Sequence, residues 1–289
     1  MSGWTPIAEE AERATRMKHP TETFPRPPRR RVLTVANQKG GVGKTTSAVN
    51  LAAALAMHGL KVLVIDLDPQ GNASTALGVE HRSGVPSIYE VLIGECSLAD
   101  AAVVTDQSEN LYCVPATIDL AGAEIELVAM EGREGRLKEA LPTGAFDELK
   151  PDYVFIDCPP SLGLLTINAM VAAEEVLIPI QCEYYALEGL SQLLRNIDLV
   201  QQHLNPNLEV STILLTMYDG RTKLADQVTA EVRNHFGDTV LRTVIPRSVK
   251  VSEAPGFGQT VLAYDPGSRG AMSYLDAARE MAERSIDGE

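Results

Sequence analysis

Residues 37–46 contain side chains and glycines that could bind the phosphates of a nucleotide. The segment reads Asn37-Gln38-Lys39-Gly40-Gly41-Val42-Gly43-Lys44-Thr45-Thr46. Its glycines let the backbone curl so that consecutive N–H groups point at a phosphate, and a following helix adds its positive end. Lys44 is then placed to reach the β- and γ-phosphates, and the Thr45 hydroxyl to ligate Mg²⁺. The pattern therefore indicates a phosphate-binding loop.

The loop departs from the common pattern at one position and carries one extra charge. The common pattern begins with a glycine five places before the Gly-Lys pair, where this chain has Gln38. Lys39 follows directly and lies too close to the base of the loop to duplicate Lys44 within one chain. The extra cation favours contact with a phosphate that is approached from another subunit.

Carboxylates follow two further apolar runs. One run leads into Asp66-Leu67-Asp68, and strand alternation puts Asp66 and Asp68 on the same side. The run Tyr153-Val154-Phe155-Ile156 closes on Asp157, which is the Walker B arrangement. Carboxylates beside a triphosphate hold Mg²⁺ and position the attacking water. Both segments therefore complement the loop.

The elements that must position these residues alternate along the chain. Strand-like runs cover 32–36, 61–66, 111–114, 153–157, 175–180, 210–216 and 240–245. Helical patterns cover 45–58, 118–130, 163–173, 187–204, 222–236 and 270–284. The alternation predicts an α/β fold with a doubly wound, mostly parallel sheet of about seven strands and helices on both faces, in one domain over 32–289. In such sheets, ligands bind beyond the carboxyl ends of the strands.

Composition and charge narrow the classes of function. No apolar run approaches the roughly 18–20 residues of a membrane span, and the start does not read as a signal peptide, so we expect a cytoplasmic protein without membrane insertion. The four cysteines lie far apart, which disfavours zinc, iron–sulfur and disulfide readings. The net charge of −14 means that the electrostatic field of the whole protein disfavours DNA binding. Residues 210–260 are an exception to this acidity, with six basic and five acidic residues. DNA binding would therefore need a local patch.

Residues 1–31 read as a flexible N-terminal extension. They hold seven Lys or Arg and four Glu, and the Pro/Arg segment 26–31 resists packing. Ile7, Ala11, Ala14 and Met17 form a thin apolar stripe. A short helix that binds a polar or scaffold protein is therefore the alternative to a disordered extension.

Taken together, the motifs resemble the ParA/Soj family of chromosome- and plasmid-partition ATPases, within the deviant Walker A group that also includes MinD. The similarity runs from about Val32 to the last helix. Besides the loop it covers 66–72, 115–120, 157–160, 183–190, 245–247 and 252–255. The loop marks the superfamily, and the later segments resemble the chromosomal branch in particular.

The resemblance implies a Mg²⁺-dependent ATPase that forms an ATP-sandwich homodimer. Catalytic roles are implied for Lys39, which touches the partner's ATP, for Lys44, and for Asp68, which orients the hydrolytic water. The implied ATP contacts are Lys39, Gly40, Gly41, Val42, Gly43, Lys44, Thr45 and Thr46, with Pro246 and Arg247 bordering adenine. The implied Mg²⁺ residues are Thr45, Asp66 and Asp157.

The family also binds double-stranded DNA without sequence preference, as the ATP dimer. The positions that match its DNA surface are Arg195, Arg221 and Arg247, with Lys223 and Lys250 close in sequence. Each could by itself be an ordinary exposed charge. The resemblance further implies a nucleoid-associated location and a ParB-type centromere-binding protein that stimulates hydrolysis and so releases the DNA, although the sequence does not show where it docks.

Other functions fit less well. MinD carries a basic amphipathic membrane helix at its C-terminus, whereas this chain ends in the acidic segment 277–289. A metabolic ATP-dependent ligase with a related loop would need a substrate pocket in place of the DNA patch. A reductase resembling nitrogenase iron protein would need cluster cysteines that the spacing does not offer. A filament former is compatible with the sequence but not indicated by it.

Overall fold

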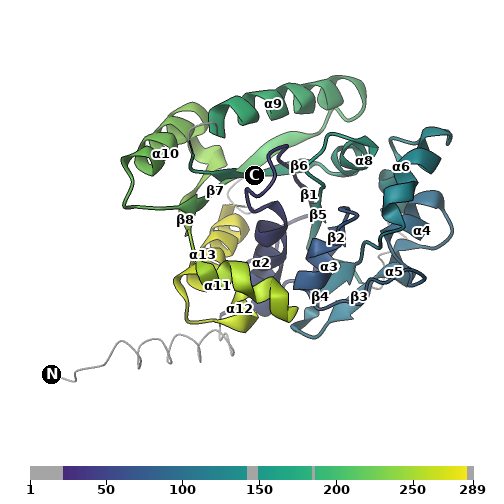
Figure 1. Cartoon of the computed structure of the whole chain (residues 1–289), viewed down its shortest axis with the longest axis horizontal. Helices are drawn as coiled ribbons and strands as arrows, with labels where there is room; N and C mark the ends of the chain where they lie inside the picture. Colours follow the sequence, from purple (N-terminus) through teal and green to yellow (C-terminus); the bar gives the residue numbers. More distant parts are fainter. Residues whose placement is uncertain (1–21, 142–148, 184–185, 285–289) are drawn as a thin grey trace.

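An eight-stranded sheet forms the centre of the protein, as a computed structural model that describes residues 22–141, 149–183 and 186–284 shows (Figure 1). The strands are β1 (Arg31–Val35), β2 (Val62–Asp66), β3 (Val103–Thr105), β4 (Ser108–Val114), β5 (Tyr153–Asp157), β6 (Glu175–Gln181), β7 (Glu209–Tyr218) and β8 (Val240–Pro246). Their order across the sheet is β3-β4-β2-β5-β1-β6-β7-β8, and among these described strands only β3 runs antiparallel to its neighbour. The predicted fold class is confirmed, with one strand more than expected.

The additional strand β3 is short and lies at the sheet edge. It pairs with β4 in an antiparallel hairpin with an irregular register. Three residues, Val103, Val104 and Thr105, are too few to show a strand periodicity, so the sequence pattern gives no sign of it.

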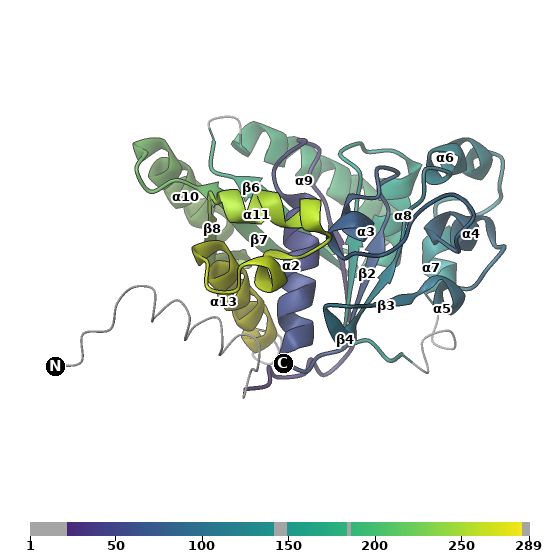
Figure 2. The same cartoon turned by 60° about the horizontal axis from the view of Figure 1, so that its bottom comes forward.

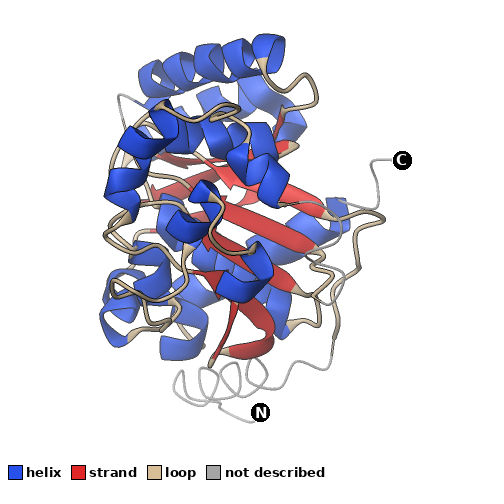
Figure 3. Ribbon diagram, turned by 90° about the vertical axis from the view of Figure 1, so that its right-hand side faces the viewer, coloured by secondary structure: helices blue, strands red, loops and turns tan. Residues whose placement is uncertain are grey.

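Helices cover both faces of the sheet, as Figure 3 shows. The bounds are α2 (Lys44–Met57), α3 (Asn72–Ala76), α4 (Ile88–Ile93), α5 (Leu98–Ala101), α6 (Leu120–Val128), α7 (Arg136–Ala140), α8 (Leu164–Ala172), α9 (Ala186–His203), α10 (Lys223–Phe236), α11 (Val249–Glu253), α12 (Val261–Tyr264) and α13 (Arg269–Arg284), with 3₁₀ turns η1 (Gly237–Thr239) and η2 (Ala254–Phe257). The six predicted helices are present, and the short helices are the ones the sequence pattern missed.

The central strands β2 and β5 are apolar up to their final aspartates because the sheet is buried on both faces there. Successive side chains of a strand point to opposite faces, so β1 sends Leu33 and Val35 into one core and Val32 into the other. Helices α2, α3, α12 and α13 close the first core, and α4 and α6–α10 close the second. Both layers hold the sheet rigidly, and with it the loops at the strand ends.

Part of the predicted N-terminal extension packs against the domain. Phe24 is buried and its ring stacks on His58 with 4.0 Å between centroids, while the Arg279 guanidinium lies over the Phe24 ring. Arg31 begins β1 and forms an ion pair with Glu175 at 2.6 Å. Packing against the domain thus begins by Phe24, within the segment that the sequence reading assigned to the extension. The rest of that extension, residues 1–21, lies outside the described residues.

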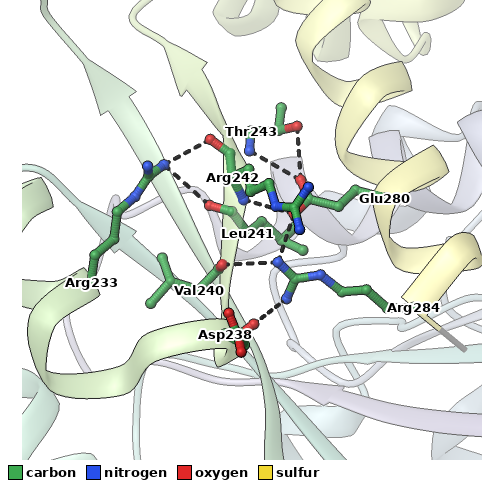
Figure 4. Close-up of polar contacts among 8 residues, drawn as sticks. All are labelled: Arg233, Asp238, Val240, Leu241, Arg242, Thr243, Glu280 and Arg284. Atoms are coloured by element: carbon green, nitrogen blue, oxygen red, sulfur yellow. Dashed lines mark hydrogen bonds and ion pairs between the residues drawn. The ribbon is translucent and has the colours of Figure 1, made fainter. Parts of the chain in front are cut away.

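The edge strand β8 is covered by side chains from α10 and α13 (Figure 4). Arg233 donates to the carbonyls of Leu241 and Arg242, and Glu280 accepts from the backbone N–H groups of Arg242 and Thr243. Arg284 donates to the carbonyls of Asp238 and Val240. These bonds occupy backbone groups that an added strand would need, which protects this edge from pairing with another chain.

The last described helix is part of the core. On α13, Ala277, Ala278 and Met281 are buried in the same core as α2, which leaves no free apolar face of the kind a membrane anchor needs. Residues 285–289 lie outside the described part of the chain. Within the described residues, no helix combines the length and the apolar character that crossing a membrane requires.

Candidate nucleotide-binding site

The loop predicted to bind phosphate connects β1 to α2 at the carboxyl edge of the sheet. In Figures 1 and 2, α2 lies between α3 on one side and α11 on the other. Gly41 and Gly43 have φ angles of 74° and 87°, in the left-handed region that favours glycine. Gly43 is also the N-cap of α2. The N–H groups of the first helical turn, which have no partner within the helix, therefore point away from the helix and toward the loop. This geometry provides a phosphate-binding site at a helix N-terminus.

Neighbouring strands hold the loop in place. The Asn37 side chain donates to the Pro179 carbonyl at 2.8 Å and accepts from the Lys39 N–H at 3.0 Å. The Thr216 hydroxyl donates to the Val42 carbonyl at 2.8 Å. The loop is therefore preorganised by β6 and β7, which lie far away in the sequence.

A cavity of about 540 Å³ opens in front of the loop. It is lined by Gly40, Gly41, Gly43, Lys44, Thr45, Thr46, Val49, Asp68, Gln70, Asn72, Thr75, Ala76, Pro160, Met217, Val251, Ser252 and Pro255. The loop, the end of β2, the segment after β5 and the region of α11 and η2 thus meet at one place. Its volume is within the range of small-molecule sites.

Lys44 is buried beside the carboxylates. Its ammonium lies 3.5 Å from the Lys39 carbonyl, and burial lowers the pKa of the group while Asp157 and Asp68 oppose that change. A buried cation without a full counter-charge attracts an anion. Lys44 also lines the cavity in front of the loop, where such an anion could reach it.

Asp66 and Asp157 lie beside each other on adjacent parallel strands, in register. Asp66 accepts hydrogen bonds from the N–H and hydroxyl of Ser74, at 2.8 and 2.7 Å. Burial raises the pKa of Asp66 to about 6 in spite of these bonds. Asp66 faces α3 and does not line the cavity, so it touches the site only through its neighbours.

Asp157 has the opposite environment. It is fully buried, neither carboxylate oxygen accepts a well-formed hydrogen bond although the Thr45 hydroxyl is near, and burial raises the pKa of Asp157 well above the usual range, with Asp66 adding to the rise. Thr45 and Lys44 oppose the rise. Two unpartnered buried oxygens beside a hydroxyl fit Mg²⁺, which binds proteins through one or two carboxylates and keeps waters and phosphates as its other ligands. No cluster of three or more His, Cys, Asp or Glu that could hold a metal ion occurs in the described residues.

Asp68 is the carboxylate that reaches the cavity. It lines the space in front of the loop, and its Oδ1 accepts a hydrogen bond from the Gln70 N–H at 3.0 Å. Its own N–H donates to Asp66 at 3.2 Å. These bonds fix the direction of the Asp68 carboxylate at the edge of the cavity.

Lys39 points away from the cavity that its own loop forms. Its ammonium donates to Glu183 Oε2 at 2.9 Å, and Gln181 holds the other oxygen of that carboxylate. The Lys39 side chain remains 39% exposed and does not line the cavity, whereas Lys44 does. One lysine therefore faces the site of its own subunit, and the other lies at the surface.

A smaller cavity of about 180 Å³ adjoins the loop on the side of β7 and β8. Pro246 and Arg247 line it together with Gly43 and Thr46. Met217 lines both cavities and has a φ angle of 50°, which is rare for a residue with a side chain. Strain of this kind is common at binding sites. The two cavities share Gly43, Thr46 and Met217 in their linings and therefore adjoin each other.

The basic residues predicted to bind DNA do not all come together. Arg221 and Arg247 line one groove of about 750 Å³ at the ends of β7 and β8, where Arg269 of α13 joins them. Lys223 begins α10 and is exposed, and Arg195 is exposed on α9. Lys250, on α11, pairs with Glu253 at 3.3 Å and lies over the Tyr264 ring.

Three residues at or near the site had no assigned role in the sequence reading. Glu183 lies within a segment that carried the family resemblance, but its pairing with Lys39 spans 144 residues. Met217 and Arg269 carry no local signal at all. Only the meeting of β7, β8 and α13 brings them to the cavities.

The buried, unpartnered state of Asp157 predicts that Asp157→Asn stabilises the ligand-free protein. A raised carboxyl pKa costs stability at pH values above the unfolded pKa, because the folded state must keep a proton that the unfolded chain releases. The variant should gain about 1 kcal/mol or more in free energy of unfolding at pH 7.5 in EDTA, since one pKa unit corresponds to about 1.4 kcal/mol. The gain should disappear as the pH falls to about 4.

Urea unfolding at both pH values measures this difference. Asp198→Asn, an exposed position on α9, makes the same charge change without burial and serves as the control. An Asp157→Asn protein that is less stable than the wild type at pH 7.5 would contradict the assignment of Asp157 as an unpaired buried carboxylate.

The fold and the loop together define a class of proteins. A parallel sheet with a glycine-rich loop between β1 and α2, followed by a strand that closes on an aspartate beside the loop, is the arrangement of P-loop nucleoside triphosphatases. In agreement, the model of the AAA domain family matches residues 30–210.

Known proteins specify the family within this class. The sporulation initiation inhibitor protein Soj of Bacillus subtilis is 54% identical over 252 residues, which cover 87% of this chain and 98% of that protein. The chromosome partitioning protein ParA of Caulobacter vibrioides is 53% identical over 258 residues, 89% and 96% of the two chains. The chain belongs to the ParA/Soj family of chromosome-partitioning proteins, which confirms the resemblance found in its motifs.

A solved structure agrees with this fold. Cobyrinic acid a,c-diamide synthase from Mycobacterium smegmatis, with a bound ATP analog and magnesium, superposes with a TM-score of 0.76 at 41% identity, covering 90% of this chain and 97% of that chain.

Proposed function

We propose that this protein is a Mg²⁺-dependent ATPase that partitions DNA by forming an ATP-sandwich homodimer. The observation that carries the proposal is the arrangement of the two lysines of the loop. Lys44 lines the cavity of its own subunit, whereas Lys39 lies outside it and is held at the surface by Glu183. A second subunit placed over the cavity would offer its Lys39 to this subunit's phosphates, and ATP would then hold the two subunits together.

The residues of the site have separate roles in this proposal. The loop N–H groups, Lys44 and Thr46 hold the phosphates, while Pro246 and Arg247 border the base. Thr45 and Asp157 would hold Mg²⁺, with Asp66 behind them, and the ion supplies neutralisation of the phosphate charge. Asp68 orients the attacking water. Hydrolysis removes the phosphate that Lys39 of the second subunit contacts, and the dimer opens.

Each subunit has one small basic patch, and DNA binding follows when a dimer brings two such patches together. Each phosphate contact contributes about 0.9 to the logarithmic salt slope, so roughly three contacts in one subunit give about 3, and a dimer about 5–6. A slope of about 3 corresponds to only a few phosphate contacts, so one subunit of a chain with net charge −14 would bind DNA weakly. ATP could therefore switch DNA affinity by bringing two patches together, without remodelling either.

The groove with Arg221 gives a direct test of the DNA surface. Arg221→Ala should lower the affinity of the ATP-bound protein for nonspecific duplex DNA and reduce the salt slope by about 1–2 per dimer. Fluorescence anisotropy at several salt concentrations measures both quantities. Arg82→Ala is the matched control, since Arg82 is also exposed and paired with a nearby carboxylate, Glu80. Equal slopes for the two variants would remove Arg221 from the DNA surface.

The cycle requires a stimulating partner. The acidic body of the protein suits the basic N-terminal peptide of a ParB-type protein. A polar or scaffold protein is a second proposed partner, and it would bind the N-terminal extension, of which residues 1–21 lie outside the described part of the chain. We further propose that the ATP dimer is associated with the nucleoid in the cytoplasm. A protein that binds DNA without sequence preference can bind anywhere on the nucleoid.

ATP turnover distinguishes this function from its alternatives. Turnover is measured alone, with duplex DNA and with the ParB N-terminal peptide. Stimulation by DNA and peptide together supports partitioning. Turnover that neither addition changes would favour a metabolic ATP-dependent ligase, a class to which the solved synthase points by its name. Recruitment to lipid vesicles instead of DNA would favour a MinD-like positioning ATPase.

A further inference from the structure

We propose that Gln107 is a positioning residue for the nucleotide, because it holds together two segments that form one side of the nucleotide cavity. We call this side the cavity wall and define it by residues 75–78, at the end of α3, and residues 251–260, around η2. The inference rests on the proposed function and deepens it, since it names a residue outside the cavity that keeps the cavity ready for ATP.

The two segments of the cavity wall meet at a pair of glycines. Figure 2 shows α3 beside the chain that runs from α11 to α12. Gly78 and Gly258 have φ angles of 69° and 65°, and a Cβ on Gly78 would lie 3.0 Å from the Gly258 carbonyl oxygen. Both segments also line the nucleotide cavity, through Thr75, Ala76, Val251, Ser252 and Pro255. The distance between the segments therefore sets the shape of the cavity on this side.

Little apolar packing supports the cavity wall. Of residues 249–257, all within the described part of the chain, only Ala254 is buried, and Phe257 is 66% exposed. A separate cavity of about 520 Å³ adjoins the wall and is lined by Leu77, Gly78 and residues 257–260. Segments with few buried apolar contacts open locally at low cost. Hydrogen bonds must therefore supply much of the stability of the wall.

Gln107 supplies such bonds with both ends of its side-chain amide. It lies in the turn between β3 and β4, and its Nε2 donates to the Ala76 carbonyl at 3.1 Å and to the Gly258 carbonyl at 3.3 Å. Its Oε1 accepts from the Thr260 N–H at 3.0 Å and from the Thr260 hydroxyl at 2.8 Å. These four bonds use the full capacity of an amide. One side chain thus holds the end of α3 and the segment around η2 at a fixed distance.

A second amide connects the cavity wall to the phosphate loop. The Asn50 side chain on α2 accepts from the Val261 N–H at 2.8 Å and donates to the Thr46 carbonyl at 2.7 Å. Of these two amides, Gln107 is the one that also reaches α3. Loss of Gln107 should therefore leave the segment around η2 tied to the loop, while its distance from α3 is no longer fixed.

The test is Gln107→Ala, which should weaken the binding of a fluorescent ADP analogue with Mg²⁺ about tenfold. Binding would then have to order the wall, and tenfold corresponds to about 1.4 kcal/mol, the net contribution of one or two hydrogen bonds. ADP is the probe because it lacks the γ-phosphate that holds the proposed dimer. Gln201→Ala is the matched control, since Gln201 also donates to a backbone carbonyl, that of Leu208 at 3.1 Å, and lines neither cavity.

Hydrogen exchange measures the wall itself in the ligand-free protein. In Gln107→Ala, the amides of residues 258–263 should exchange at least about tenfold faster than in the wild type, because the wall opens more often. Mass spectrometry of the peptide that contains Thr260 follows this exchange. Gln107→Glu is the conservative variant, whose carboxylate still accepts from Thr260 but cannot donate to Ala76. It should keep the exchange of Thr260 slow.

Three outcomes would overturn the inference. An ADP affinity of Gln107→Ala equal to that of Gln201→Ala, with only a lower urea midpoint, would leave Gln107 a purely stabilising role. Unchanged exchange of residues 258–263 in Gln107→Ala would show that the wall does not depend on this side chain. Fast exchange of Thr260 in Gln107→Glu would reject Oε1 as its anchor. A wild type that binds no ADP analogue would instead reject the proposed function, and the exchange contrast would still show whether Gln107 holds the wall.

Discussion

Lys39→Ala is expected to abolish the ATP-dependent dimer while leaving nucleotide binding to the single subunit nearly unchanged. Lys39 does not line its own cavity, so its removal takes no contact from the phosphates that Lys44 and the loop N–H groups hold. In the closed dimer, however, it would be the contact between one subunit and the other's ATP. The affinity for duplex DNA with ATP should therefore fall at least about tenfold, to the level of a single patch.

A fluorescent ATP analogue measures nucleotide binding, sedimentation velocity measures dimerisation, and fluorescence anisotropy measures DNA binding, all on one preparation of the variant. Glu183→Gln is the control, because it frees Lys39 from its ion pair in the same subunit without removing it. This variant should dimerise at least as well as the wild type. A Lys39→Ala protein that holds DNA normally with ATP would reject the role of Lys39 across the interface, and with it the dimer requirement for DNA binding.

Asp68→Ala should separate assembly from hydrolysis. The carboxylate lines the cavity but pairs with no loop residue, and its hydrogen bond from Gln70 fixes its direction. Without it the attacking water loses its orientation, which should lower turnover by about 10²–10⁴-fold. ATP binding, dimerisation and DNA binding should persist, since none of them uses this carboxylate.

Single-turnover hydrolysis and DNA anisotropy measure the two halves of this prediction. Asp68→Asn keeps the size of the side chain and tests whether the loss comes from the charge. Loss of ATP-dependent DNA binding in Asp68→Ala would contradict the role given to Asp68 and would place it in phosphate or metal binding instead.

The elements of the fold could be predicted where their signal is local. Buried parallel strands are continuous apolar runs, and β1, β2, β5 and β6 follow the sequence pattern to within a residue or so. The short elements could not be predicted, because three residues of β3 or five of α7 show no period. Their conformation depends on what they pack against.

Phe24 shows a different failure. A Pro/Arg segment has the composition of a linker, but composition does not reveal that one aromatic ring finds His58 of a turn that comes later in the chain. The stacked pair holds the segment before β1 on the domain. Only the tertiary structure places the two rings together.

The sequence by itself determined the phosphate loop, the strand that ends in Asp157 and the family, because glycine spacing and a strand followed by an aspartate are local features with one physical meaning. The tertiary structure decided the rest. It turned Asp66 toward Ser74 and left Asp157 unpartnered, paired Lys39 with Glu183, and brought Arg269 to Arg221 and Arg247. It also placed the Gln107 side chain against Ala76 and Gly258. These facts depend on which elements meet, and residues far apart in a sequence leave no local pattern of their meeting.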